Sequence, residues 1–125
     1  MFALVFHVDN KASAASSIRR ELDDSSFATA LSRPFCQDRP AISATKSLTG
    51  HSQGAAGVHE AIYTLLMMQN NFICESANIV QLDPAVEGAN IVRKRIDDAN
   101  INVALSNSFG FGGTNASLVF QRYEK

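Results

Sequence analysis

The sequence predicts an α/β fold, because it combines one long amphipathic helix with several segments of strand character. From Ser52 to Gln69 the apolar residues recur three and four positions apart, which is the spacing of one helix face. Asn102–Ser106 and Ala116–Gln121 alternate with the period of a strand. A length of 125 residues is enough for one modest domain.

The composition is that of an ordinary globular chain, with 46% hydrophobic residues, 18% charged residues and a net charge of -1. This charge gives no electrostatic reason to expect nucleic acid or an anionic membrane as a partner. The apolar segment Met1–Val8 is too short to span a bilayer and has no basic region before it, so it predicts a buried strand. Cys36 and Cys74 lack the spacing of a zinc site or a C-x-x-C pair. We therefore expect a cytoplasmic protein with free thiols and without a metal or cofactor.

The remaining segments predict shorter elements. Lys11–Leu31 has the intermittent apolar positions of a helix of modest quality, and Ser32–Pro40 contains two prolines and predicts a loop. This loop is the best internal boundary, and it divides residues 1–39 from residues 40–125. Asn70 and Asn71 are expected to end the long helix. Beyond them, Phe72–Asp83 predicts an extended stretch closed by an Asp-Pro turn, and Asn90–Arg93 is a short strand candidate.

The turn before the long helix holds a lysine and a histidine, Lys46 and His51, five residues apart. Ser52 is a residue type that caps helices, and such a cap would bring the positive end of the helix dipole close to His51. That position favours the neutral imidazole, which donates one hydrogen bond without carrying charge. The small residues Gly54 to Gly57 then keep the first helical turns thin, so that a neighbouring helix or a ligand chain can approach the backbone.

The same turn also has the G-x-S-x-G pattern of a hydrolase nucleophile elbow, in the form Gly-His-Ser52-Gln-Gly. A serine hydrolase needs a histidine later in the chain, with an acidic residue between the two. His59 is the only histidine after Ser52, and because it follows in the same predicted helix we expect that it cannot fold back onto the serine. Hydrolysis through Ser52 remains an alternative function.

A glycine-rich loop separates the two strands predicted near the C-terminal end. Gly110, Gly112 and Gly113 fall within four positions, and this density of glycine lets backbone N–H groups turn toward a common point. The spacing is not that of a dinucleotide-binding G-x-G-x-x-G loop, and a strand rather than a helix follows. An oxyanion or a carbonyl oxygen is the better fit, with Phe109 and Phe111 excluding water from the site.

Two separated motifs carry a family resemblance. ISATKSLTGHSQGAAGV and, further on, SNSFGFGGTNASLVF resemble the C-terminal part of β-ketoacyl-acyl carrier protein synthases, most of all the type I enzymes of bacterial fatty-acid synthesis. The resemblance covers roughly Pro40 to Tyr123, so residues 40–125 are expected to be a C-terminal part of such a synthase and residues 1–39 to lie outside the family. It implies a partial thiolase-like fold, namely the C-terminal half with a mixed sheet and packed helices.

The resemblance also implies a reaction and a set of roles. The family performs a decarboxylating Claisen condensation of an acyl thioester with malonyl-acyl carrier protein, so acyl carrier protein is the implied partner. His51 resembles the second histidine of the Cys-His-His triad, which donates a hydrogen bond to the malonyl thioester carbonyl, and Lys46 resembles the active-site lysine. Phe111 matches the gating phenylalanine, whose backbone N–H joins the oxyanion hole. Gly110, Gly112 and Gly113 give this loop its freedom to move.

The family's other two catalytic groups have no counterpart in this sequence. The surroundings of Cys36 and Cys74 do not match the nucleophile motif, and no His-Gly-Thr segment precedes Lys46. The chain is therefore expected to be inactive alone, and to act with a missing N-terminal half or as a homodimer. The alternative is a non-catalytic dimerisation or interaction fragment, because half of a layered core leaves apolar surface uncovered.

Overall fold

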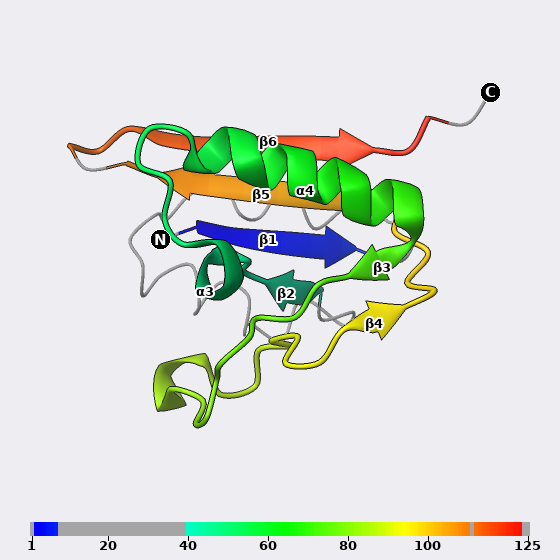
Figure 1. The fold of residues 1–125 in the computed structure, drawn as a ribbon, viewed down its shortest axis with the longest axis horizontal. Coiled ribbons are helices and arrows are strands. Elements are labelled where there is room, and N and C mark those ends of the chain that lie inside the picture. Colours follow the sequence, from blue (N-terminus) through cyan, green and yellow to red (C-terminus); the bar gives the residue numbers. More distant parts are fainter. Residues whose placement is uncertain (1, 8–39, 111, 124–125) are drawn as a thin grey trace.

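The computed structural model describes residues 2–7, 40–110 and 112–123. The predicted helix Lys11–Leu31, the loop before Pro40 and Cys36 lie outside the described residues, as does Phe111. The described part is a small α/β unit in which one long helix covers one face of a four-stranded sheet (Figure 1). The α/β class predicted from the sequence is thus confirmed at this coarse level.

The sheet has the strand order β2-β1-β5-β6. The first strand, β1 (Phe2–His7), lies at the position of the strand predicted over Met1–Val8, and it pairs on one side with β2 (Ala41–Ser43). On its other side it pairs with β5 (Val103–Phe109), and β5 pairs in turn with β6 (Asn115–Gln121). The two C-terminal strands predicted from their alternation are therefore confirmed, although β5 continues to Phe109, because its pairing with β6 reaches the residues beside the hairpin loop.

The strand directions differ from the mixed sheet that was expected. All three described pairings of the four-stranded sheet are antiparallel, because β1 lies between β2 and β5 and runs against both. Parallel pairing is found in an isolated bridge between Ile42 and Ile91. The bridge is what the structure shows in place of the strand predicted over Asn90–Arg93.

Helix α4 (Ala56–Asn70) is the long helix predicted from the spacing, but it begins four residues later than expected. Gln53, Gly54 and Ala55 form a turn instead, and Gly54 has a φ of 81°, which is outside the helical range. The N-cap residue is Ala55, without a side-chain cap, so the prediction that Ser52 caps this helix is wrong. The predicted end is confirmed, since Asn71 is left-handed and its N–H donates to the carbonyl of Met67.

The segment between α4 and β5 is less extended than predicted. Only Phe72 and Ile73 form a strand, β3, which pairs with the unpredicted strand β4 (Ile96–Asp97) in a separate two-stranded sheet. The turn signal at Asp83 and Pro84 is followed by a short 3-10 helix, η1 (Pro84–Val86). Extended strands need partners for their backbone groups. In this segment many of the described backbone bonds are local turn contacts, such as the Val86 N–H to the Asp83 carbonyl, and strand pairing is confined to β3, β4 and the bridge at Ile91.

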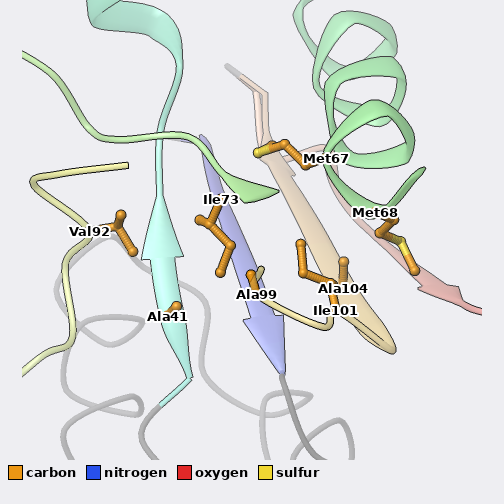
Figure 2. Packing of buried hydrophobic residues seen from close by; sticks show 8 residues of the cluster. All are labelled: Ala41, Met67, Met68, Ile73, Val92, Ala99, Ile101 and Ala104. Atoms are coloured by element: carbon orange, nitrogen blue, oxygen red, sulfur yellow. The ribbon is translucent and has the colours of Figure 1, made fainter. Parts of the chain in front are cut away.

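The main apolar core lies between the C-terminal half of α4 and the sheet (Figure 2). Met67 and Met68 of α4 are buried there. Ile101, just before β5, is completely shielded from solvent, with 0% of its surface exposed. The cluster consists of Ala41, Met67, Met68, Ile73, Val92, Ala99, Ile101 and Ala104.

The apolar stripe of α4 that revealed the helix points away from this core. Val58, Ile62, Leu65 and Leu66 are each between 46% and 62% exposed. The residues that α4 buries are instead Ala56, Glu60, Thr64, Met67 and Met68. The helix therefore presents one partly polar face to the sheet and one aliphatic face to solvent in the described structure.

Candidate functional site

A single helical turn separates the two residues predicted to be catalytic. Strand β2 leads into α3 (Lys46–Thr49), a short helix that the sequence did not predict, and Lys46 is its first residue. Gly50 ends it with a φ of 75°, and the Gly50 N–H donates to the carbonyl oxygen of Lys46 at 2.9 Å. This bond closes the turn, so that Lys46 and the exposed His51 lie on either side of it.

The side chain of Lys46 is ion-paired with Glu60, from the second turn of α4. The Lys46 Nζ donates to Glu60 Oε1, and the exposed fraction is 23% for the lysine side chain and 5% for the glutamate side chain. The second oxygen, Glu60 Oε2, is buried without a hydrogen-bond partner in the described structure. Sequence reasoning missed Glu60, although a carboxylate on the same helix face as Thr64, Met67 and Met68 was the signal that could have found it.

Ser52 and His59 are in contact, which corrects the expectation that His59 cannot reach the serine. Ser52 Oγ lies 2.8 Å from His59 Nδ1. The expectation failed because it placed both residues on one helix, whereas Ser52 precedes the turn at Gln53, Gly54 and Ala55, and this turn lets the chain fold back over the first turn of α4. His51 likewise lies before this turn, so the capping geometry that was to place it at the helix N-terminus is absent.

The start of α4 packs directly against the strand that leads into the glycine-rich loop. A Cβ atom added at Gly57 would lie 3.1 Å from Ser108 Oγ of β5. The close approach predicted for a neighbouring helix or a ligand chain is made here by a strand instead. As a result the turn that carries His51 and the β5–β6 hairpin loop lie at the same end of the molecule (Figure 1).

Two glycine N–H groups of the hairpin loop donate to carbonyl groups within the loop itself. The Gly110 N–H donates to the carbonyl of Thr114 at 2.7 Å, and the Gly113 N–H donates to the carbonyl of Gly110 at 3.3 Å. In this conformation these two N–H groups close the hairpin and do not converge on a common acceptor, contrary to the expectation. Gly112 and Gly113 do adopt the positive φ values, 89° and 88°, that favour glycine.

Of the two phenylalanines predicted to exclude water from this loop, the structure describes Phe109 alone. Phe109 is the last residue of β5, half-buried, and packs against the small cluster of Ile42 and Leu105. Phe111, the residue that resembles the family's gating phenylalanine, is outside the described residues. Its role and those of His51 and Lys46 stay predictions.

Several polar side chains are buried in the described structure, some on α4 and others on β2, on β5 and in the segment after β3. Thr64 Oγ1 donates to the carbonyl of Glu60 at 2.7 Å, and the Ala44 N–H donates to Ser76 Oγ at 3.0 Å. The Ser43 hydroxyl donates to the carbonyl of Cys74. The buried polar residues of the described part are Ser43, Thr45, Glu60, Thr64, Ser76, Ser106 and Asn107.

Cys74 does not have the properties of a catalytic nucleophile. The thiol is half-buried, and its burial, with a smaller effect from the Glu75 carboxylate, raises the pKa of Cys74 above the ordinary value of 9.0. A nucleophilic cysteine needs the opposite shift, because the thiolate is the reactive form.

Two absences hold for the described residues alone. Among them, no group of three or more His, Cys, Asp or Glu side chains could hold a metal ion. Their helices include none with the length and apolar character to cross a bilayer.

Comparison with known proteins defines the class of the chain. The family model described as "Beta-ketoacyl synthase, C-terminal domain" matches residues 12–80, which is more than half of the chain. The chain therefore belongs to this family. The match begins at residue 12, inside the segment 1–39 for which no resemblance was expected, and the boundary at residues 39 and 40 stays a prediction.

The particular relatives are condensing enzymes. The chain is 60% identical over 94 residues to 3-oxoacyl-[acyl-carrier-protein] synthase 1 of Haemophilus influenzae, a match that covers 75% of the chain and 23% of the relative. The corresponding enzyme of Escherichia coli is 54% identical over 93 residues, 74% of the chain and 23% of the relative. Synthase 2 of Mycobacterium leprae is 37% identical over 103 residues, 82% of the chain and 24% of the relative. The resemblance stated from the two motifs is confirmed, and the chain spans less than a quarter of the length of these relatives.

Proposed function

We propose that this chain supplies the enolate-stabilising part of a 3-oxoacyl-[acyl-carrier-protein] synthase. The observation that carries the proposal is the Lys46–Glu60 ion pair, which holds the turn before His51 against the helix after it. In the proposed reaction the carboxylate of a malonyl thioester leaves as carbon dioxide, and the electron pair of the broken C–C bond forms an enolate. His51 donates a hydrogen bond to the thioester oxygen on which this charge develops.

The ion pair gives Lys46 a positioning role within this proposal. Glu60 is almost completely buried and is itself fixed on α4, so the lysine that it binds cannot swing away without leaving an uncompensated carboxylate. The remaining Glu60 oxygen can accept one more hydrogen bond from a water or a polar group of the assembled site. Phe111 and the glycines Gly110, Gly112 and Gly113 are proposed to gate the acyl chain.

The nucleophile of the condensation is proposed to come from outside residues 1–125. The sequence holds neither the family's nucleophile motif nor its His-Gly-Thr segment. The exposed aliphatic stripe of α4 (Val58, Ile62, Leu65, Leu66) supports this, because it is a surface that the remainder of a full-length synthase would cover. We propose acyl carrier protein, carrying an acyl or malonyl group, as the partner of the assembled enzyme, and a homodimer as its form.

The test replaces the corresponding part of a full-length relative with residues 40–125 of this chain. We expect the chimera to condense an acyl thioester with malonyl-acyl carrier protein, whereas the isolated chain forms no product and gains no acyl adduct in its intact mass. An adduct mapped to Cys36 or Cys74 would contradict the proposal that the nucleophile comes from elsewhere. An inactive chimera that folds and dimerises like the relative would contradict the proposed function.

A second function has one specific observation in its favour, the contact between Ser52 Oγ and His59 Nδ1. A serine beside a histidine could act as a nucleophile and base, although a hydrolase also needs an acidic residue that orients the histidine. The nearest glutamate in sequence, Glu60, is bound to Lys46. A fluorophosphonate probe separates the two functions. Labelling that disappears in Ser52→Ala would support hydrolysis, and an unlabelled chain would exclude it.

A further inference from the structure

The turn that carries His51 is held by bonds on both of its sides. On the side toward α3, the Gly50 N–H donates to the Lys46 carbonyl at 2.9 Å. On the side toward α4, Ser52 makes two contacts: its carbonyl accepts the Ala55 N–H at 3.0 Å, and its hydroxyl lies 2.8 Å from His59 Nδ1. His51 is the one residue between these two anchored positions.

The hydroxyl contact is the only one of these three that joins the turn to the body of α4 through side chains. Helix α4 has no side-chain cap and no acidic residue in its first turn. Gly50 and Gly54 flank the turn with φ values of 75° and 81°, and a Cβ added to either would have no atom within 4 Å, so packing does not confine them. A turn with a glycine on each side needs a specific bond to stay in one conformation.

We propose that Ser52 and His59 form a positioning pair that fixes the backbone and rotamer of His51. Ser52 is the covalent neighbour of His51, and His59 is anchored in the first turns of the helix, where its N–H donates to the Ala55 carbonyl at 3.0 Å. The pair transmits the position of the helix to the turn. Its catalytic importance rests on the proposed function of His51, but the geometric effect does not.

The surroundings of His59 suit this role better than a catalytic one. The ring lies beside Tyr63, with a centroid separation of 6.1 Å and a tilted arrangement, so one side of the imidazole is against an aromatic ring. The adjacent residue, Glu60, points to Lys46 instead. A hydrogen bond between the Ser52 hydroxyl and Nδ1 then fixes which way the imidazole faces.

Nuclear magnetic resonance on the isotope-labelled chain measures the proposed effect directly. Three-bond couplings across the His51 side chain report whether one staggered χ1 rotamer dominates or several interconvert. We expect a single dominant rotamer in the natural sequence. In Ser52→Ala the ratio of the dominant rotamer to the others should fall by about fivefold, which corresponds to the loss of one ordinary hydrogen bond.

A set of variants separates positioning from general damage to the fold. Ser52→Thr keeps a hydroxyl and should restore the natural couplings, and His59→Phe should reproduce the loss seen in Ser52→Ala. The double variant should lose no more than either single one, because both remove the same bond. Ser47→Ala is the matched control, since Ser47 is an exposed serine in α3 whose carbonyl, and not its hydroxyl, accepts the bond from Asn78.

The outcomes decide the inference independently of catalysis. Unchanged His51 couplings in both Ser52→Ala and His59→Phe would overturn it, as would an equal change in Ser47→Ala. If Ser52→Ala fails to fold, His59→Phe carries the same test alone. Responsive couplings together with an inactive chimera would contradict only the proposed function, whereas an active chimera with unresponsive couplings would contradict only the positioning pair.

Discussion

The two halves of α4 rest on the same sheet but bury opposite kinds of side chain. Its C-terminal half places Met67 and Met68 against Ile101 and other apolar residues. The turns before them bury two polar side chains, Glu60 and Thr64. Buried apolar area stabilises a fold directly, whereas a buried ion pair with an unpartnered oxygen contributes little or opposes it. The apolar core and the proposed site therefore lie toward opposite ends of one helix.

The largest expected effect belongs to the apolar end. Ile101→Ala should lower the free energy of unfolding by about 3–4 kcal/mol, because it removes a completely buried side chain and leaves a cavity. Denaturant unfolding followed by circular dichroism measures it. Ile96→Ala is the matched control, since this isoleucine of β4 is 40% exposed and should cost much less. Equal losses in the two variants would break the distinction between the two ends.

Removing one partner of the Lys46–Glu60 ion pair should destabilise the fold more than removing both partners. Lys46→Met should cost about 2–3 kcal/mol of unfolding free energy, somewhat below the usual value for a fully buried pair because the lysine is partly exposed. The double variant Lys46→Met/Glu60→Gln should recover part of that loss, because no buried charge is left without its partner. A double variant that is less stable than Lys46→Met would contradict the view that the unpaired Glu60 carboxylate causes the loss.

The contact between α4 and β5 offers a smaller test that sharpens the boundary of the site. Gly57→Val should destabilise by about 1–2 kcal/mol, because even a Cβ at this position lies 3.1 Å from Ser108 Oγ. Gln69→Val introduces the same side chain at an exposed position of the same helix, and because valine has a higher helix propensity than glycine, a loss in Gly57→Val does not come from propensity. If thermal melts show equal losses, the close approach of helix and strand is not a constraint.

The smallest effect is expected at Cys74, which contacts both the apolar cluster and the buried polar residue Ser43. Its side chain packs on the apolar cluster, and its carbonyl accepts the Ser43 hydroxyl. Because burial raises the pKa of Cys74 in the folded chain, the folded state favours the protonated thiol. This contribution to stability is fully present below the unfolded pKa near 9.0 and is lost as the pH rises toward the higher folded value.

The measurement is the rate of disulfide exchange with a small aromatic disulfide, in a Cys36→Ser background so that Cys74 alone reports. At pH 8 the folded chain should react more slowly than the urea-unfolded chain. The stability of Cys74→Ser should vary less between pH 8 and 10 than that of its parent. Equal reactivity of the folded and unfolded thiols would contradict the shift.

The sequence was informative where periodicity decides the structure. Helix α4 and the strands β5 and β6 follow from spacing alone, and Asn71 ends the helix as its residue type predicts. The period did not reveal which face of α4 meets the sheet. Both faces carry side chains that can be buried, so a helix of this kind has no single apolar side to assign.

The sequence predicted residues of the candidate site, but it did not predict the contacts that they make. Lys46 and His51 came from the motif, but Glu60 and the bond from Ser52 to His59 depend on a turn in place of the first predicted helical turn. That turn depends on Gly54, whose φ is positive. The sequence does not indicate which φ a glycine adopts when it lies among residues that are compatible with a helix. The backbone hydrogen bond between Gly110 and Thr114 likewise depends on a loop conformation that the sequence does not indicate.

The most direct test compares, within the active chimera, the proposed site before the start of α4 with the apolar core beneath its C-terminal half. His51→Gln and Ile101→Val are assayed side by side for condensation of an acyl thioester with malonyl-acyl carrier protein and for denaturant stability. We predict that His51→Gln lowers kcat by at least about 100-fold, as expected for the loss of a donor to a developing oxyanion, with little change in stability. Ile101→Val should lose about 1 kcal/mol of stability and keep its activity. A chimera that retains its rate with His51→Gln would contradict the account.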